Sequence, residues 1–276
     1  MTNSVHTNAA AAVALQNLSR TNDNLTGVQN RVSTGLKIQG AKDNAAIWAI
    51  AQGQRADLGA LSAVKQSLDR ATSIVDVALS AGESISDLLN QLKEKVVAAK
   101  DSSLKTQSRQ LLHADFQALL RAISSAVENS SFDGANILNG TLTNGLKFLA
   151  NADASSFVTL SGKNLTLSGT ILTLGMADTL LTATGATTAL TKLDASINNL
   201  NKSLGDIGAQ AKQISAHNTF VTKLSDTVTS GIGNLGDADL AKESARLQAL
   251  QVQQQLGAQA LSIANQAPQI ILSLFR

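Results

Sequence analysis

The sequence predicts a mainly helical protein, with long helices from both ends of the chain in a coiled-coil bundle and a small β-hairpin insertion. Three observations predict this fold class: two long heptad repeats, one middle segment with a different pattern, and a shortage of aromatic side chains. Aromatic residues make up 3% of the 276 residues, although 43% are hydrophobic. Because rings supply much of the buried area of a compact core, this chain must bury Ala, Leu, Val and Ile along extended helical contacts.

The first heptad repeat covers residues 61–99 and predicts one long helix. Its apolar positions advance by three and four residues in turn, which is the 3.5-residue period of a coiled-coil seam. These positions are Leu61, Val64, Leu68, Ala71, Val75, Ala78, Gly82, Ile85, Leu89, Leu92, Val96 and Ala99. Gly82 is the one break in the series.

A second repeat covers residues 193–235, and its seam contains polar residues. The seam positions are Leu193, Ile197, Leu200, Leu204, Ile207, Ala211, Ile214, Asn218, Val221, Ser225, Val228, Ile232 and Leu235. A buried Asn at such a position typically fixes the register of a coiled coil at some cost in stability. Between the two repeats, a shorter helix is expected from the spacing of Leu112, Phe116, Leu119, Ile123 and Ala126.

Residues 141–190 differ from both repeats in composition and in pattern. Gly, Thr, Ser and Leu dominate, and four charged residues occur. The stretch FVTLSGKNLTLSGTILTL, residues 157–174, alternates apolar and polar residues around two Ser-Gly turn signals. Such alternation predicts short strands or a hairpin.

Both ends of the chain contain long stretches without charged side chains. Residues 1–19 and 247–275 lack Asp, Glu, Lys and Arg. One interpretation is a pair of frayed, solvated tails, because isolated helices are marginal in water. The interpretation that we favour is packing among many copies, where an unpaired buried charge would be costly and amide side chains can bond to one another. The residues expected to pack are Leu18, Leu25, Val32, Leu240, Leu247, Leu250, Leu261 and Ile263.

Composition and motif spacing argue against several classes of function. The chain has no Cys, which excludes disulfides and thiol chemistry. Its 22 basic and 20 acidic residues give a net charge of +2, too balanced for an electrostatic nucleic-acid binder. The Gln-rich C-terminal stretch does not suit a membrane helix. The three His lack partners at ligand spacing, and no Ser lies in a G-x-S-x-G context. We therefore expect no metal, no cofactor and no enzymatic activity.

Three blocks of the sequence carry a family pattern. NRVSTGLKIQGAKDNAAIWAIAQGQRADLGAL, residues 30–61, resembles the N-terminal signature of the bacterial flagellins, R-[LV]-S-[ST]-G-[LK]-x-I-x-x-A-x-D-[DN]-A-A. Residues 236–276, with ANQAPQ and a final LSLFR, resemble the flagellin C-terminus. Residues 109–140 are similar to the family's segment that leads into FDG-x-N-I-L-x-G. The blocks follow the family's order, and the short middle resembles the compact flagellins of alphaproteobacteria.

This resemblance implies a structural subunit that self-assembles into the hollow, extracellular flagellar filament used for motility. Residues 1–36 and 236–276 would pair as an inner tube, and residues 37–140 and 191–235 would form an outer tube. Residues 141–190 would be a short variable β-rich surface segment. The implied partners are further copies of the chain, sister flagellins, the export machinery with its chaperone, and the cap and junction proteins, but neither nucleic acid nor membrane. Two alternatives are the hook–filament junction protein and a secreted coiled-coil effector that acts on membranes.

Glycines in two places suggest joints between the two tubes. Gly231, Gly233 and Gly236 spell G-x-G-x-x-G, but a coiled-coil seam precedes them rather than the strand that a dinucleotide site requires. We interpret them as a flexible joint, because Gly tolerates the backbone angles of a helix break. Gly35 and Gly40 are expected to form the corresponding joint on the N-terminal side.

Overall fold

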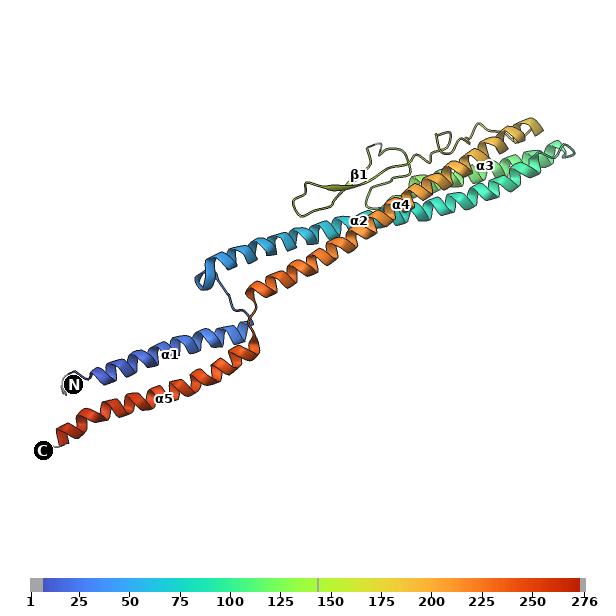
Figure 1. The fold of residues 1–276 in the computed structure, drawn as a ribbon. Coiled ribbons are helices and arrows are strands. Elements are labelled where there is room, and N and C mark those ends of the chain that lie inside the picture. Colours follow the sequence, from blue (N-terminus) through green and yellow to red (C-terminus); the bar gives the residue numbers. More distant parts are fainter. Residues whose placement is uncertain (1–6, 143, 274–276) are drawn as a thin grey trace. The chain divides into compact units, whose positions relative to one another are not determined.

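The structure is a computed structural model that describes residues 7–142 and 144–273, with the side chains of these up to residue 266. Its elements are α1 (Ala9–Thr34), α2 (Ala41–Ala99), α3 (Thr106–Asn129), β1 (Leu146–Leu149), β2 (Phe157–Leu160), α4 (Ala183–Gly236) and α5 (Leu240–Ser273) (Figure 1). The predicted helical fold with a small hairpin and paired terminal helices is confirmed.

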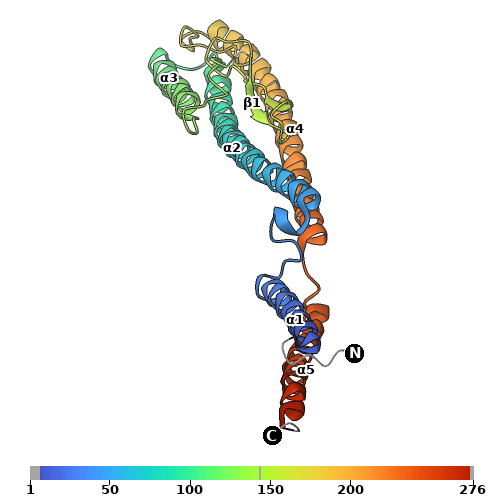
Figure 2. The ribbon, with the colours of Figure 1, turned by 90° about the vertical axis from the view of Figure 1, so that its left-hand side faces the viewer.

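The chain divides into two compact units. We call residues 57–226 the central unit, and residues 1–56 together with 227–276 the terminal unit. In the central unit, α3 lies alongside α2 in both views (Figure 1, Figure 2). These units are defined by contacts within one copy, whereas the predicted domains are layers of a polymer. The predicted domain boundaries therefore stay a prediction.

The seam between α2 and α4 forms the core of the central unit. Each apolar position predicted on α2 in residues 61–99 is at most 4% exposed. On α4, every second seam position from residue 193 to 221 is fully buried: Leu193, Leu200, Ile207, Ile214 and Val221. Phe116, Leu120 and Ile123 of α3 join the same core. Because burial of each large aliphatic side chain contributes roughly 1.5–3 kcal/mol, this seam is the main source of stability in the unit.

Gly82, the break in the first repeat, is explained by the packing of α4. A Cβ atom at this position would overlap the side chain of Leu204. At Gly205, the next residue of α4, nothing lies within 4 Å of the place that a Cβ atom would occupy. Glycine at position 82 therefore lets the Leu204 side chain pack directly against the backbone of α2.

Arg109 of α3 caps the C-terminal end of α2. Its side chain is buried, and its Nη1 and Nη2 donate to the carbonyl groups of Ala99 at 2.6 Å and Asp101 at 2.8 Å. The last carbonyl groups of a helix lack partners within the helix and carry partial negative charge. The guanidinium satisfies the Ala99 carbonyl at the end of α2 and the Asp101 carbonyl in the turn, and it thereby fixes the turn from α2 into α3.

The β-rich insertion contains an antiparallel hairpin that lies earlier in the chain than the predicted pattern. β1 pairs with β2, so only the first four residues of the stretch 157–174 are in a strand. The two Ser-Gly signals follow the hairpin and do not form its turn. The hairpin is held to α2 by Ser67, whose Oγ accepts a hydrogen bond from the Leu149 N–H at 3.1 Å.

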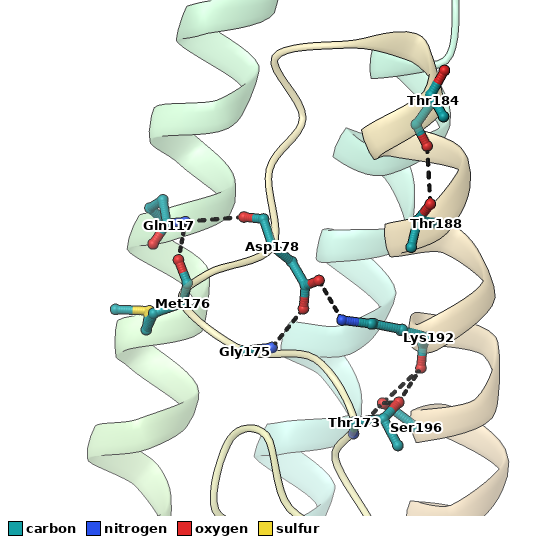
Figure 3. A network of polar contacts seen from close by, with 9 residues as sticks. All are labelled: Gln117, Thr173, Gly175, Met176, Asp178, Thr184, Thr188, Lys192 and Ser196. Carbon is teal, nitrogen blue, oxygen red and sulfur yellow. Dashed lines mark hydrogen bonds and ion pairs between the residues drawn. The ribbon is translucent and has the colours of Figure 1, made fainter.

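Residues 161–182 have no regular strand and are fixed to the helices by side chains (Figure 3). Asp178 accepts a hydrogen bond from the Gly175 N–H at 2.8 Å and pairs with Lys192 of α4 at 2.6 Å. Gln117 of α3 donates to two backbone carbonyl groups of the segment. Because these bonds satisfy polar groups that a sheet would otherwise satisfy, the segment can bury Leu172, Leu174 and Leu180.

The packing at Gly82 leads to a matched pair of predictions. Gly82→Ala should lower the free energy of unfolding by about 1–3 kcal/mol, because an added methyl group overpacks the seam. Gly205→Ala should raise it by about 0.5–1 kcal/mol, because Ala favours an exposed helix over Gly. Urea unfolding followed by circular dichroism measures both. Equal effects of the two substitutions would contradict the close approach at position 82.

Candidate assembly surface of the terminal unit

A narrow apolar contact joins α1 to α5. Leu25, Val28 and Leu250 are at most 9% exposed, and Val32 and Leu247 pack against them. At roughly 1.5–3 kcal/mol for each buried side chain, this contact is small beside the backbone entropy of two ordered helices, about 1–2 kcal/mol per residue. The buried apolar cluster of this pair is therefore small for the length of the two helices.

Amide side chains connect α1 and α5 at two places. Nδ2 of Asn8 donates to the Ala264 carbonyl at 2.7 Å, and Nε2 of Gln254 donates to Oδ1 of Asn22 at 2.8 Å. Asn8 also caps α1, since its Oδ1 accepts a hydrogen bond from the Ala11 N–H. Neutral amides thus supply the polar contacts between these helices without adding a charge that burial would penalise.

An ion pair links the C-terminal end of α1 to the N-terminal end of α5. Arg31, in the last turn of α1, lies 3.6 Å from Oε1 of Glu243, in the first turn of α5. Each charge has the sign that its helix end favours. Oε2 of Glu243 is buried and accepts no hydrogen bond from the described residues.

Outside this contact, both helices present apolar side chains to solvent. Large side chains of α1 and α5 that are half exposed or more are Val13, Leu15, Leu240, Val252, Leu256 and Ile263. No charged residue occurs in residues 247–275. A surface that stays in water normally carries charges and few such side chains. This surface is therefore suited to contact with another protein surface.

The structure divides the eight predicted packing residues into three groups by burial. Leu25 and Leu250 are buried between α1 and α5, and the half-buried members are Leu18, Val32, Leu247 and Leu261. Leu18 faces Gly257, where a Cβ atom would come within 3.2 Å of it. Leu240 and Ile263 are exposed.

Sequence reasoning missed five apolar residues of this pair. Val28 is buried, and Val13, Leu15, Val252 and Leu256 are exposed. The predicted set covers only part of the circumference of each helix, so it overlooks apolar side chains elsewhere on that circumference. Apolar residues at any position of a charge-free helix would have been the better signal.

The predicted joints lie where two short connections cross within the terminal unit. Gly35 ends α1 with a φ of 72°, a left-handed conformation that favours glycine. The Gly35 carbonyl accepts a hydrogen bond from the Ala238 N–H at 2.8 Å, and the Gly236 carbonyl accepts one from the Lys37 N–H at 2.7 Å. The chain between α4 and α5 is thereby bonded to the chain between α1 and α2.

The other three glycines have different surroundings. Gly40 precedes α2, and its N–H donates to the carboxylate of Asp43. Gly231 and Gly233 lie inside α4, which continues to Gly236, so neither marks the helix break. The short connection before Leu240 marks it instead. A Cβ atom at position 233 would lie 2.7 Å from the carboxylate of Asp237, an exposed side chain that can turn away.

Two histidines have structural partners in the central unit. Nδ1 of His113 accepts a hydrogen bond from the Leu180 N–H at 3.4 Å, and Nε2 of His217 lies 2.7 Å from the Ala150 carbonyl. Among the described residues, no group of three or more His, Asp or Glu side chains is placed to hold a metal ion. Within the same part of the chain, no helix combines the length and hydropathy needed to cross a membrane.

Comparison with known proteins shows similarity along the whole chain. The family model described as the bacterial flagellin N-terminal helical region matches residues 5–143, and that of the C-terminal helical region matches residues 190–275. The chain is 54% identical to flagellin FljJ of Caulobacter vibrioides over 275 residues, which cover 99% of this chain and 98% of that protein.

Two solved structures resemble the fold. Bacillus cereus flagellin has a TM-score of 0.50 at 20% identity, covering 56% of this chain and 88% of that chain. A Vibrio parahaemolyticus structure described as that of a flagellar hook-associated protein has a TM-score of 0.54 at 13% identity, covering 71% of this chain and 100% of that chain. At these identities, both similarities concern the fold alone.

The narrow contact between α1 and α5 predicts that they order fully only in an assembly. Limited proteolysis of the monomer should remove both helices and leave the central unit, because few buried contacts oppose local unfolding of the pair. Mass spectrometry of the fragments identifies the cut sites. The same digestion of assembled protein is the control and should leave the chain intact. Resistance of α1 and α5 in the monomer would contradict the prediction.

Proposed function

The chain belongs to the bacterial flagellin family, and we propose that the exposed apolar surface of its terminal unit is where successive copies pack in the filament. A flagellin is a structural subunit that self-assembles into the flagellar filament used for motility. One observation carries the proposal: α1 and α5 expose large apolar side chains, and residues 247–275 contain no charge.

Packing among copies would remove the exposed apolar side chains of this surface from water. Burial of the remaining exposed parts of Val252, Leu256 and Ile263 against neighbours would add roughly 1–2 kcal/mol for each side chain. The absence of charge means that no ionised group has to be desolvated when the surface is covered. Because every copy repeats the contact, a modest gain for each side chain is multiplied along the polymer.

We further propose that the layers of the filament follow the predicted domains. Residues 1–36 and 236–276 form the inner layer, residues 37–140 and 191–235 the outer layer, and residues 141–190 a surface segment. The distribution of charge supports this assignment. Five ion pairs lie in the central unit: Arg70–Asp133, Lys93–Asp194, Lys95–Asp115, Lys163–Asp206 and Lys192–Asp178. Charged pairs suit a layer that meets water, and neutral side chains suit an interior.

The partners of the assembled chain are further copies of itself and sister flagellins. We propose in addition that the unassembled chain meets the export machinery and a chaperone, and that the cap and junction proteins contact the ends of the filament. In this role the protein is an extracellular structural subunit, and its activity is self-assembly rather than catalysis.

Sequence identity favours a filament subunit over the hook–filament junction protein. The relationship to FljJ is 54% identity over nearly the whole of both chains. The likeness to the hook-associated protein is at 13% identity and concerns the fold. Elongation of filament seeds by the purified chain separates the two functions, because a junction protein does not extend a long filament.

Substitutions on the exposed face test the packing proposal. Val252→Asp and Ile263→Asp should each abolish elongation of seeds, because a buried unpaired carboxylate costs on the order of 3–5 kcal/mol in every copy. Electron microscopy of seeded reactions measures filament length. Leu111→Asp is the matched control, because Leu111 is 68% exposed on α3 of the central unit. Normal filaments from Val252→Asp and Ile263→Asp would refute the proposed surface.

A further inference from the structure

One side of α4 holds residues 150–178 of the β-rich insertion. The side chains of α4 that bond to this stretch are Lys192, Ser196, Asn199, Asp206, Gln210 and His217. Successive members of this series are three, four or seven residues apart. Residues at these intervals lie on the same side of a helix. The insertion therefore follows one line along α4, and His217 lies against its hairpin at the Ala150 carbonyl.

The same line continues along α4 with two exposed apolar side chains. Phe220 follows His217 by three residues, and Leu224 follows Phe220 by four. Phe220 is 57% exposed and Leu224 is 37% exposed. The ring centroids of His217 and Phe220 are 5.9 Å apart, so these apolar side chains begin next to the contact between His217 and the insertion. We call Phe220 and Leu224 the apolar strip.

The insertion carries a second apolar surface beside its contact with Lys192. Met176 and Leu181, which we call the insertion end, are 45% and 46% exposed. Figure 3 shows the Met176 side chain pointing away from Lys192. Asp178 is the one charged residue in residues 164–191, and its carboxylate pairs with Lys192 of the same copy at 2.6 Å. The insertion end can therefore be covered without the desolvation of an unpaired carboxylate.

The insertion end of one copy cannot reach the apolar strip of the same copy. The ion pair with Asp178 fixes the insertion end near Lys192. Phe220 lies 28 residues further along α4. At a rise of 1.5 Å per residue, the two surfaces are about 42 Å apart. A contact between them therefore needs two molecules.

We propose that the apolar strip of one copy binds the insertion end of a second copy. This contact rests on the proposed function, because it describes how central units meet in the filament. The occupant follows from continuity, since the preceding positions on this line of α4 already hold the insertion of their own copy. At the apolar strip the line changes from polar to apolar, and the insertion end offers apolar side chains that match it.

The contact is heterologous, because two different surfaces meet in it. Each copy binds one neighbour through its apolar strip and another through its insertion end. A contact of this kind repeats without limit when its rotation does not close a ring. Removal of the exposed parts of both surfaces from water favours the contact. The central units thus add a directional contact to the apolar packing of the terminal units.

Cysteine cross-linking tests the contact, and the chain has no Cys of its own to react. Two double variants carry Leu224→Cys, one with Met176→Cys and the other with Leu181→Cys. Because Cys behaves as a small apolar side chain, both should still form filaments. Treatment of the filaments with a short bismaleimide should give a ladder of covalent oligomers on a denaturing gel for at least one pair, since each copy is linked to two neighbours.

Three controls accompany the cross-linking. Filaments of each single-cysteine variant should give no ladder, because one cysteine can link a copy to one neighbour at most. Dilute monomers of the double variants should give none either. A double variant with Leu224→Cys and Val252→Cys tests α5 of a neighbouring copy as the alternative occupant. A ladder from this pair instead of the first two would overturn the proposed contact.

Charge substitutions give a second readout. Leu224→Asp and Leu181→Asp should each slow the elongation of seeds about tenfold or more, because the new carboxylate is buried without a partner. Both residues are exposed in the monomer, so circular dichroism of each variant should match the original chain. Leu111→Asp is again the control.

The outcomes separate this inference from the proposed function. Failure of the original chain to elongate seeds would refute the proposed function. If the original chain elongates while neither of the first two pairs gives a ladder, or while both Asp variants keep its rate, the docking of the apolar strip on the insertion end is wrong and the proposed function stands.

Discussion

Close packing of α2 against α4 over more than thirty residues is the interaction on which the rest of the structure depends. Small and aliphatic side chains fill the seam, and one position, Gly82, has no room for a Cβ atom beside Leu204. Without large aromatic side chains, the buried area has to come from the length of this contact rather than from its thickness. A core of this kind leaves each helix with an outer face. Because the residues of that face are not needed for the core, their polarity can be suited to contacts with other copies.

The two units use their outer faces differently. In the central unit, Arg109 and Asp178 satisfy backbone groups at helix ends and in an irregular segment, and ion pairs tie α3 and α4 to α2. The terminal unit has a narrow seam, neutral amide bridges and exposed aliphatic side chains. The first set of contacts stabilises a single chain in water, whereas the second leaves an apolar surface that we propose neighbouring copies cover.

Much of the fold could be predicted, because heptad spacing records which side of a helix is buried. The seam positions of residues 61–99 are buried as predicted. The hairpin was predicted in the wrong part of its segment, since Ser-Gly pairs mark turns of any kind, and residues 161–182 are fixed by Gln117 and Lys192 from distant helices. On the terminal helices, the predicted set included Leu25 and Leu250, which are buried, but overlooked Val252 and Leu256, which lie off the seam.

The sequence alone determined the helical class, the two seams, the charge-free ends and the flagellin pattern, because each is a property of spacing or composition along one chain. Tertiary structure decided the conformation of the glycines predicted as joints: Gly35 adopts a positive φ, whereas Gly231 and Gly233 continue a helix. It also decided which charges are used within the molecule, pairing Lys93 and Lys95 while leaving Glu83 and Asp87 unpaired among the described residues. Both depend on what a neighbouring helix brings within reach, and a one-dimensional pattern does not contain that information.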